Sequence, residues 1–280
     1  MTAGGNAQKG KRRREILKEL GLTPLWHVRP ARPARPASMP QPPELSQERQ
    51  AAPLPPPLPA ASAMQAESGE QVCSDSSVGA VSALEDRRSK ILQMGWEELE
   101  ASVAGCIACR LCHSRTRTVF GVGDQSADWL YIGEGPGAQE DATGEPFVGQ
   151  AGKLLDNMLT AIGLKRGRNV FITNIVKCRP PGNREPRPDE AQCCEPYLAR
   201  QIELIRPKLI IALGKTAVQN LLHTDASLGS LRGRLHQHSG IPVIVTYHPA
   251  YLLRTLPAKA KAWEDLCFAR STMEALGTSG

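Results

Sequence analysis

The sequence predicts an α/β fold, a three-layer α/β/α arrangement with a central, mainly parallel four-stranded sheet. The first observation is a set of four short apolar runs, which are typical of buried strands. The second is that segments with helical spacing of apolar residues separate these runs, and such alternation indicates parallel strands joined by covering helices. The expected strands are residues 129–133, 170–176, 209–214 and 242–249, and the expected helices are residues 151–164, 189–207 and 215–223.

A disordered extension, residues 1–81, is expected before the folded domain, which we place at residues 82–280. Of the 23 prolines in the chain, 12 fall between Pro24 and Pro59, in a segment that buries too little apolar surface to offset the entropy of ordering. The extension starts with the basic run "KGKRRREILKELGL", for which a nucleic-acid contact, a protein partner and a solvated tail are open interpretations. The folded domain opens with a helical pattern over residues 82–106.

Composition bears on the setting in which the protein works. The chain has no apolar run near the roughly 18 residues that a membrane span needs, so no membrane association is expected. Its start lacks the apolar core of a signal peptide. Together with eight cysteines, this favours the reducing cytoplasm, where close cysteine pairs bind metals or do redox chemistry more often than they form disulfides. The formal net charge of +6 favours acidic partners only weakly.

Each predicted strand ends in a motif rich in glycine or polar residues. "GEGPG" follows the first strand, "TNIVKC" ends the second, "GKTA" follows the third and "HPAYLLR" follows the fourth. The carboxyl ends of parallel strands meet at one edge of the sheet, where ligands bind in such folds. "GQAGK" lacks the spacing of a P-loop, and "GEGPGA" fits the dinucleotide fingerprint only loosely, with no acidic residue at the end of the next strand. We therefore expect a pocket here, and not a nucleotide-phosphate cradle.

Cysteines with metal-binding spacing flank the predicted sheet. "GCIACRLC" contains Cys106 and Cys109 in C-x-x-C spacing, followed by Cys112. A second pair comes from Cys178 in "IVKC" and from one of two adjacent cysteines in "QCC", Cys194 or Cys193. Four thiolates suit either a tetrahedral zinc ion or a [4Fe-4S] cluster, and spacing alone does not choose between them.

Four motifs together closely resemble those of the family 4 uracil-DNA glycosylases, the iron-sulfur type of bacteria and archaea: "CIAC", "GEGPGAQEDATGEPFVGQAG", "TNIVKCRPP" and "HPAYLLR". The resemblance runs from about residue 106 to residue 254. It implies that residues 82–280 are a catalytic domain that hydrolyses the N-glycosidic bond of uracil in DNA. It also implies a [4Fe-4S] cluster that ties the N-terminal helix and the loop after Cys178 onto the sheet. Its ligands would be Cys106, Cys109, Cys178 and Cys194, with Cys112 as a bystander.

The resemblance further implies a uracil pocket at the strand ends, with Gly135 among the uracil-binding residues. Phe147 would stack on the flipped base, although a lone phenylalanine is otherwise assigned to the core. Asn174 would read the base edge, because its amide donates to O4 and accepts from N3–H, and cytosine reverses both positions. His248 would donate a hydrogen bond to O2 as negative charge develops there.

Two acidic residues of the first motif are the remaining catalytic candidates. Glu134 is expected to position water and to stabilise the oxocarbenium-like sugar. Glu140 is expected to line the pocket near the uracil C5, where a methyl group would clash. The sequence does not separate the two roles, and a place on a solvated loop stays open for Glu140.

The last motif holds candidates for inserting into DNA, namely Leu252, Leu253 and Arg254. An apolar side chain between base steps offsets part of the cost of unstacking. The competing interpretation is that these leucines begin the next helix and pack inward. Basic residues near the same strand ends are candidates for phosphate contacts, namely Arg179, Arg184, Arg187, Lys215 and Arg254.

The sequence thus predicts a monofunctional uracil-DNA glycosylase that leaves an abasic site and initiates base excision repair. No lysine is placed to form a Schiff base with the sugar, so strand cleavage is not expected. We expect a monomer that acts on uracil in single- or double-stranded DNA at the bacterial nucleoid. Two other classes compete: a nucleic-acid binder with a structural zinc, and an electron-transfer protein. Neither needs Glu134, Asn174 and His248 together.

Overall fold

The computed structural model describes residues 76–277. Helix α2 (Ser76–Gln93) begins before the expected domain boundary at residue 82, and α3 (Trp96–Ala104) follows it. The helical pattern expected over residues 82–106 is therefore interrupted, because Gly95 takes an extended conformation ahead of α3. The disorder predicted for the N-terminal extension up to residue 75 lies outside the described residues. The division into extension and catalytic domain stays a prediction.

A six-stranded sheet forms the centre, in the order β1-β3-β2-β4-β6-β5. Its four inner strands run parallel, and they are the four strands expected from the sequence, so the parallel core is confirmed. Three of them are buried along their whole length, which explains their continuous apolar runs. The inner strands are β2 (Trp129–Gly133), β3 (Val170–Asn174), β4 (Leu209–Leu213) and β6 (Ile241–Thr246).

Two short edge strands extend the expected four-stranded sheet. β1 (Val122–Gly123) pairs antiparallel with β3, and β5 (Leu235–His238) pairs antiparallel with β6. β1 has only two residues, and β5 alternates exposed and half-buried side chains in "LHQH". Neither edge has the continuous apolar run by which the inner strands were predicted.

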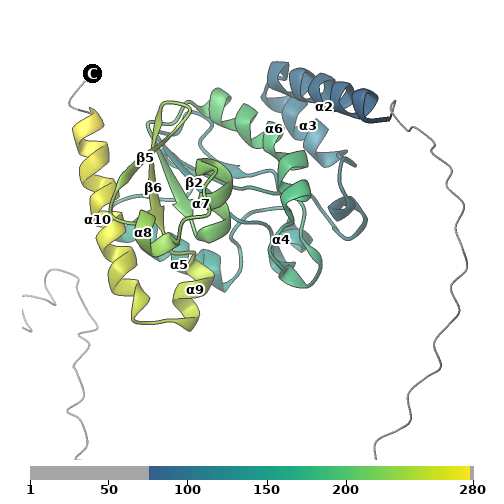
Figure 1. Ribbon diagram of the computed structural model, residues 1–280. Coiled ribbons are helices and arrows are strands. Elements are labelled where there is room, and N and C mark those ends of the chain that lie inside the picture. Colours follow the sequence, from purple (N-terminus) through teal and green to yellow (C-terminus); the bar gives the residue numbers. More distant parts are fainter. Residues whose placement is uncertain (1–75, 278–280) are drawn as a thin grey trace, which may run out of the picture. The chain divides into compact units, whose positions relative to one another are not determined.

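Helices cover both faces of the sheet, which confirms the three layers (Figure 1). One apolar cluster joins the sheet to α5 (Gln150–Ala161), α9 (Pro249–Arg254) and α10 (Ala258–Gly277). A second cluster joins the opposite face to α6 (Pro188–Ile205) and α7 (Lys215–Leu222). The sheet is therefore buried on both sides, and its carboxyl edge stays open for a site.

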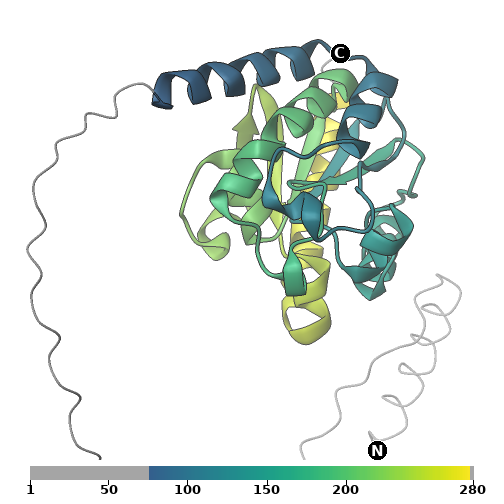
Figure 2. The ribbon, with the colours of Figure 1, turned by 90° about the vertical axis from the view of Figure 1, so that its right-hand side faces the viewer.

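The first two described helices pack on α6 through a third apolar cluster that includes Ile91, Leu99 and Tyr197. Figure 2 shows α2 lying along the top of the domain in this arrangement. The connecting segments hold two short helices, α4 (Ala138–Thr143) and α8 (Leu228–Leu231), and two 3-10 turns, η1 (Arg110–His113) and η2 (Pro181–Asn183). None of the helices within residues 76–277 is long and apolar enough to cross a membrane.

Candidate active site

A pocket of about 630 Å³ lies at the carboxyl ends of the parallel strands. All four strand-end motifs contribute to its wall, as expected from the meeting of parallel strand ends. The polar and aromatic residues expected in the pocket all line it, namely Glu134, Gly135, Glu140, Phe147, Asn174 and His248. The fold thus brings together side chains that lie up to 114 positions apart in the chain.

Asn174 is the last residue of β3, in register with Gly133 at the end of β2. Its side chain is only 2% exposed, and Oδ1 is buried without a hydrogen-bond partner. Buried polar atoms normally have a partner, so Oδ1 is a ready acceptor for a ligand N–H in the pocket. Gly133 leaves the room for this arrangement, because a Cβ there would lie 2.5 Å from Oδ1 and 2.6 Å from the ring of Phe147.

Phe147 and His248 face each other across part of the pocket. Their ring centroids are 5.6 Å apart and their planes are inclined by 32°. The Phe147 side chain is largely buried, and its backbone has a φ of 56°, which is uncommon for a residue with a side chain. The ring is therefore held in a single place, as a stacking surface for a planar base requires.

His248 caps the N-terminus of α9, where its Nδ1 accepts a hydrogen bond of 3.1 Å from the backbone N–H of Ala250. This contact assigns the proton of the neutral ring to Nε2. Burial lowers the pKa of His248 to about 4, with a contribution from Arg254 that Glu140 partly opposes. At neutral pH the ring is uncharged and has one N–H to donate.

Glu134 follows β2 and accepts a hydrogen bond of 2.7 Å from the hydroxyl of Thr216 in α7. Burial raises the pKa of Glu134, the Thr216 hydroxyl opposes this shift, and the nearby Glu185 adds to it. Thr216 belongs to the "GKTA" motif after the third predicted strand, and nothing in the motif itself indicates this contact. The contact with Glu134 depends on the pairing of β4 with β2, which brings the ends of these two strands side by side.

Glu140 uses its carboxylate to hold backbone. One oxygen accepts from the N–H groups of Val148 and Gly149, each at 3.0 Å, and the other accepts from Gly137 at 3.1 Å. With these three bonds the carboxylate stabilises the loop that carries Phe147, and the catalytic role expected from the sequence stays a prediction. Its position on the pocket wall leaves the rejection of a C5 methyl group as a prediction.

The expected wedge residues separate into inward and outward side chains. Leu252 is 1% exposed and belongs to the apolar core under α9, which favours the competing interpretation of inward packing, and its role as an intercalating residue stays a prediction. Leu253 is 41% exposed, and Arg254 is exposed and lines the pocket. Adjacent residues of a helix point about 100° apart, so in α9 Leu252 faces the core and Leu253 faces solvent.

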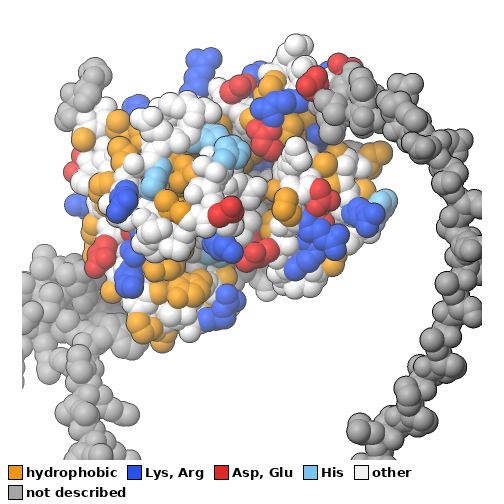
Figure 3. Space-filling view, viewed as in Figure 1, with side chains coloured by type: hydrophobic (Ala, Val, Ile, Leu, Met, Phe, Trp, Pro, Cys, Tyr) orange, Lys and Arg blue, Asp and Glu red, His pale blue; other side chains and the backbone are white. Residues whose placement is uncertain are grey.

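Figure 3 views the molecule from the same side as Figure 1. On this side, basic and acidic side chains are interspersed, and hydrophobic side chains gather over α9. Arg184 is paired with the buried carboxylate of Glu190 at 2.6 Å, and Arg179 donates to Asn183 at 2.8 Å. Lys215 is exposed at the pocket margin. Arg187 is exposed but does not line the pocket. The structure therefore leaves Lys215 and Arg254 as the stronger candidates for phosphate contacts.

The cysteines expected to bind metal lie around one small cavity of about 10 Å³. Three groups donate to its sulfurs: Arg115 Nη1 to Cys178 at 3.1 Å, the backbone N–H of Lys177 to Cys194 at 3.3 Å, and Arg87 Nη2 to Cys106 at 3.8 Å. Such donors stabilise thiolates. These donors were not predicted from the sequence, because neither a backbone N–H group nor the contacts of Arg87 and Arg115 follow from the spacing of the cysteines. The cavity is lined by six cysteines, namely Cys106, Cys109, Cys112, Cys178, Cys193 and Cys194.

The donor set fits a resident metal group with several thiolate ligands. Burial raises the pKa of Cys109 to about 11 and that of Cys194 to about 12, so these ligands need a compensating positive charge to ionise, which a metal supplies. Within residues 76–277, no three cysteine, histidine or acidic side chains converge closely enough to hold a single metal ion.

Comparisons with known proteins agree with this geometry. The profile of the Uracil DNA glycosylase superfamily matches residues 120–267, which include the whole pocket. The type-4 uracil-DNA glycosylase of Archaeoglobus fulgidus is 42% identical over 165 residues, covering 56% of this chain and 82% of the relative. The enzyme of the same name from Saccharolobus solfataricus is 44% identical over 185 residues, covering 63% and 84%. That from Thermotoga maritima is 44% identical over 160 residues, covering 56% and 83%.

Proposed function

The chain belongs to the uracil DNA glycosylase superfamily and, within it, to the type-4 enzymes, and from this premise we propose how its residues excise uracil from DNA. The observation that carries the proposal is the unpartnered Oδ1 of Asn174 in a pocket that also holds an aromatic ring and a neutral histidine. An enzyme that acts on a base must take it out of the stack and enclose it. The pocket has the groups that this task needs.

Recognition of uracil rests on Phe147 and Asn174. The Phe147 ring stacks on the flipped base, while Asn174 Oδ1 accepts from N3–H and Nδ2 donates to O4. Cytosine presents the opposite pattern at these two positions, which leaves both amide groups without a partner. The backbone at Gly135 approaches the base because no side chain intervenes. Discrimination against cytosine is therefore a direct consequence of the orientation of one amide.

Cleavage breaks the bond between C1′ of the sugar and N1 of uracil, and both bonding electrons go to the base. The Nε2–H of His248 donates to O2, where negative charge develops, and this hydrogen bond is stronger in the transition state than in the ground state. The Glu134 carboxylate stabilises the cationic sugar and accepts a proton from the water whose oxygen adds to C1′. Solvent then protonates the uracil anion, and an abasic site remains.

We assign the cysteine cavity to a [4Fe-4S] cluster held by Cys106, Cys109, Cys178 and Cys194, with Cys112 and Cys193 as neighbours. The cluster supplies cross-linking between segments and takes no part in the cleavage step. Cys194 is favoured over Cys193 because it receives the hydrogen bond from Lys177, whereas the recorded contact of Cys193 is through its carbonyl. Analysis of iron and acid-labile sulfide in the purified protein tests this assignment, and zinc in their place would contradict it.

The proposed partner is uracil-containing DNA, single- or double-stranded, met by a monomer in the cytoplasm. Lys215 and Arg254 contact phosphates near the flipped nucleotide, and Leu253 enters the gap in the stack. The N-terminal extension is proposed to bind a separate protein partner. Lys215 is the lysine that lines the pocket among the described residues. Borohydride treatment should trap no covalent adduct with DNA if hydrolysis is monofunctional, because no Schiff base forms.

The central test is a single-turnover assay on a uracil-containing oligonucleotide, followed by alkali to reveal abasic sites. We expect release by the wild type and a loss of about 10²- to 10³-fold in His248→Ala, the size expected for removal of one transition-state donor. Asn174→Ala should be slowed strongly as well. Asn157→Ala and His113→Ala, both at exposed positions, are matched controls and should keep the wild-type rate. Absence of release from cluster-loaded wild type would reject the proposal.

A further inference from the structure

The backbone of Phe147 is held in a conformation that a phenylalanine does not adopt without support. Its φ of 56° lies in the left-handed region, which costs free energy for a residue with a Cβ and persists only where the surroundings enforce it. The ring must nevertheless stay in place if it is to stack on a base. The contacts that enforce this conformation therefore belong to the function of the pocket.

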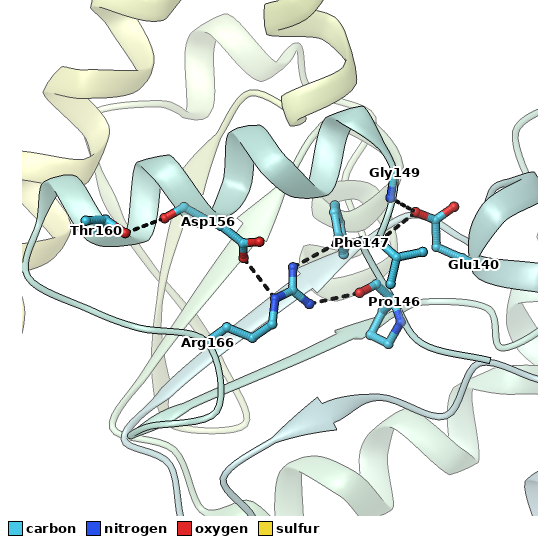
Figure 4. Close-up of polar contacts among 8 residues, drawn as sticks. Glu140, Pro146, Phe147, Gly149, Asp156, Thr160 and Arg166 are labelled. Atoms are coloured by element: carbon cyan, nitrogen blue, oxygen red, sulfur yellow. Dashed lines mark hydrogen bonds and ion pairs between the residues drawn. The ribbon is translucent and has the colours of Figure 1, made fainter. Parts of the chain in front are cut away.

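One side of this segment is held by Arg166, which lies beyond α5 and outside the pocket wall. Its Nη1 donates to the carbonyl of Pro146 and its Nη2 to the carbonyl of Phe147, both at 2.9 Å (Figure 4). The planar guanidinium presents two parallel N–H groups, a geometry that a lysine cannot reproduce. A single side chain thus fixes two consecutive carbonyls on either side of the strained φ angle.

Asp156 orients this guanidinium. Its Oδ1 accepts from Nε of Arg166 at 2.8 Å, and Thr160, one turn further along α5, donates to the carbonyl of Asp156 at 2.8 Å. The ion pair leaves both terminal nitrogens of Arg166 free to face the loop, as Figure 4 shows. Asp156 therefore sets the orientation of the Arg166 guanidinium group.

The opposite side of the segment is held by Glu140, whose carboxylate accepts hydrogen bonds from the N–H groups of Val148 and Gly149. Behind it, Gly152 in the first turn of α5 allows the closest approach, since a Cβ there would lie 1.7 Å from the Phe147 carbonyl oxygen. The loop is thus fixed through its carbonyls by Arg166 and through its N–H groups by Glu140. Of these two, only Glu140 reaches the pocket.

We propose that Arg166, oriented by Asp156, is a positioning residue that holds the Phe147 ring where it stacks on the flipped uracil. The inference rests on the proposed excision of uracil and extends it to a residue that touches neither substrate nor pocket. Arg166 acts only through Phe147, so it affects steps that involve the base and leaves binding to the DNA backbone unchanged. This separation makes the proposal testable.

The experiment uses Arg166→Met, which keeps the aliphatic stem, and Arg166→Lys, which keeps the charge but loses the fork. Arg168→Met, at an exposed position two residues away, is the matched control. Two probes are compared with the single-turnover rate: inhibition by free uracil, and binding to an oligonucleotide with a tetrahydrofuran abasic analogue, which lacks the base. Thermal unfolding checks that each variant is folded, and Asp156→Asn is the alternative if Arg166→Met does not fold.

For Arg166→Met we expect excision to slow by about 10- to 100-fold, the range that follows from misplacing a group in an active site. Inhibition by uracil should weaken with it, and binding to the abasic analogue should not change. Arg166→Lys should fall between the wild type and Arg166→Met, and Arg168→Met should match the wild type. In a double mutant with Phe147→Ala, removal of Arg166 should cause no further loss, because the two residues act as one unit.

Three outcomes would overturn the inference: an unchanged excision rate in Arg166→Met, equal weakening for the abasic analogue, or losses that add fully to those of Phe147→Ala. The second and third would make Arg166 a general structural residue. Failure of the proposed function itself is distinct, because it would appear as an inactive wild type.

Discussion

Two sites follow the same strand and differ in almost every physical property. Asn174, at the end of β3, lines the base pocket, which has a volume of about 630 Å³. Its buried amide oxygen has no hydrogen-bond partner. The cysteine cavity takes in Cys178 four residues later, is about 10 Å³ in volume, and supplies donors to its sulfurs. A roomy site with an unpartnered acceptor is suited to a ligand that comes and goes, whereas a small site whose sulfurs receive hydrogen bonds is suited to a permanent occupant.

Lys177 joins the two sites. Its buried ammonium donates to the Thr173 hydroxyl at 2.6 Å, to the Asn174 carbonyl at 2.9 Å and to the Gln201 amide oxygen at 2.7 Å. Its backbone N–H donates to Cys194. The end of β3, which is proposed to read the base, is therefore tied to the segment that carries the cysteines, so damage to one should reach the other through structure.

The largest effect is expected from Cys178→Ala, which removes a buried proposed ligand. A structural metal site contributes its binding energy to folding, so we expect loss of iron and of cooperative unfolding, and no separate loss of chemistry. Far-ultraviolet circular dichroism and iron content measure this. Cys112→Ala is the matched control and should stay folded with full iron content. A folded, iron-free and active Cys178→Ala would remove the proposed contrast between a permanent and an exchanging site.

In the base pocket, Asn174→Asp should reduce the single-turnover rate by roughly 10³-fold, with the fold preserved. A carboxylate cannot donate to O4, and a site built to hydrogen-bond its substrate rejects a mismatched partner strongly. The rate on a uracil oligonucleotide checks this, with Asn157→Asp on the exposed side of α5 as control. A rate near that of the wild type would mean that the amide does not read the base.

The pH dependence should distinguish the two titratable groups of the pocket. Glu134 is proposed to act as a carboxylate and its pKa is raised by burial, so the rate should fall about tenfold per pH unit below a midpoint that lies above the usual pKa of a glutamate. His248 adds no transition near neutral pH because its pKa is about 4. Thr216→Val removes the hydrogen bond that favours the carboxylate and should move the midpoint upward. If the fall in rate at low pH persists in Glu134→Gln, a group other than Glu134 is responsible for it.

The smallest effect on activity is expected at the α9 leucines. Leu253→Ala should slow excision about two- to fivefold in double-stranded DNA and leave single-stranded DNA unaffected, because only a duplex has a gap to fill. Leu252→Ala should instead lower the free energy of unfolding by about 2–5 kcal/mol, as expected for truncation of a core leucine. Single-turnover rates on both substrates test Leu253→Ala, and denaturant unfolding tests Leu252→Ala. The opposite pattern would make Leu252, and not Leu253, the residue that enters the gap in the stack.

The parallel core and the pocket at the strand ends were accessible from sequence for a definite reason. Buried strands such as β2 and β4 need continuous apolar runs, and parallel strands with covering helices place their carboxyl ends together. Glu134, Asn174 and His248 each follow such a run, so they had to meet. Family motifs then attached chemical roles to these positions, a step that periodicity alone does not allow.

The sequence by itself determined the order of the inner strands and their helices along the chain, because hydrophobic periodicity is a local property. It also determined which polar residues stand at the strand ends. Only the tertiary structure decided which residues those polar groups contact. Glu140 binds backbone, Leu252 faces the core, Thr216 reaches Glu134 and Arg166 holds the Phe147 loop. These pairings join segments that are 8 to 82 positions apart. A hydrogen bond over such a span depends on the packing of the whole sheet and its helices, and this packing is set by the complete core.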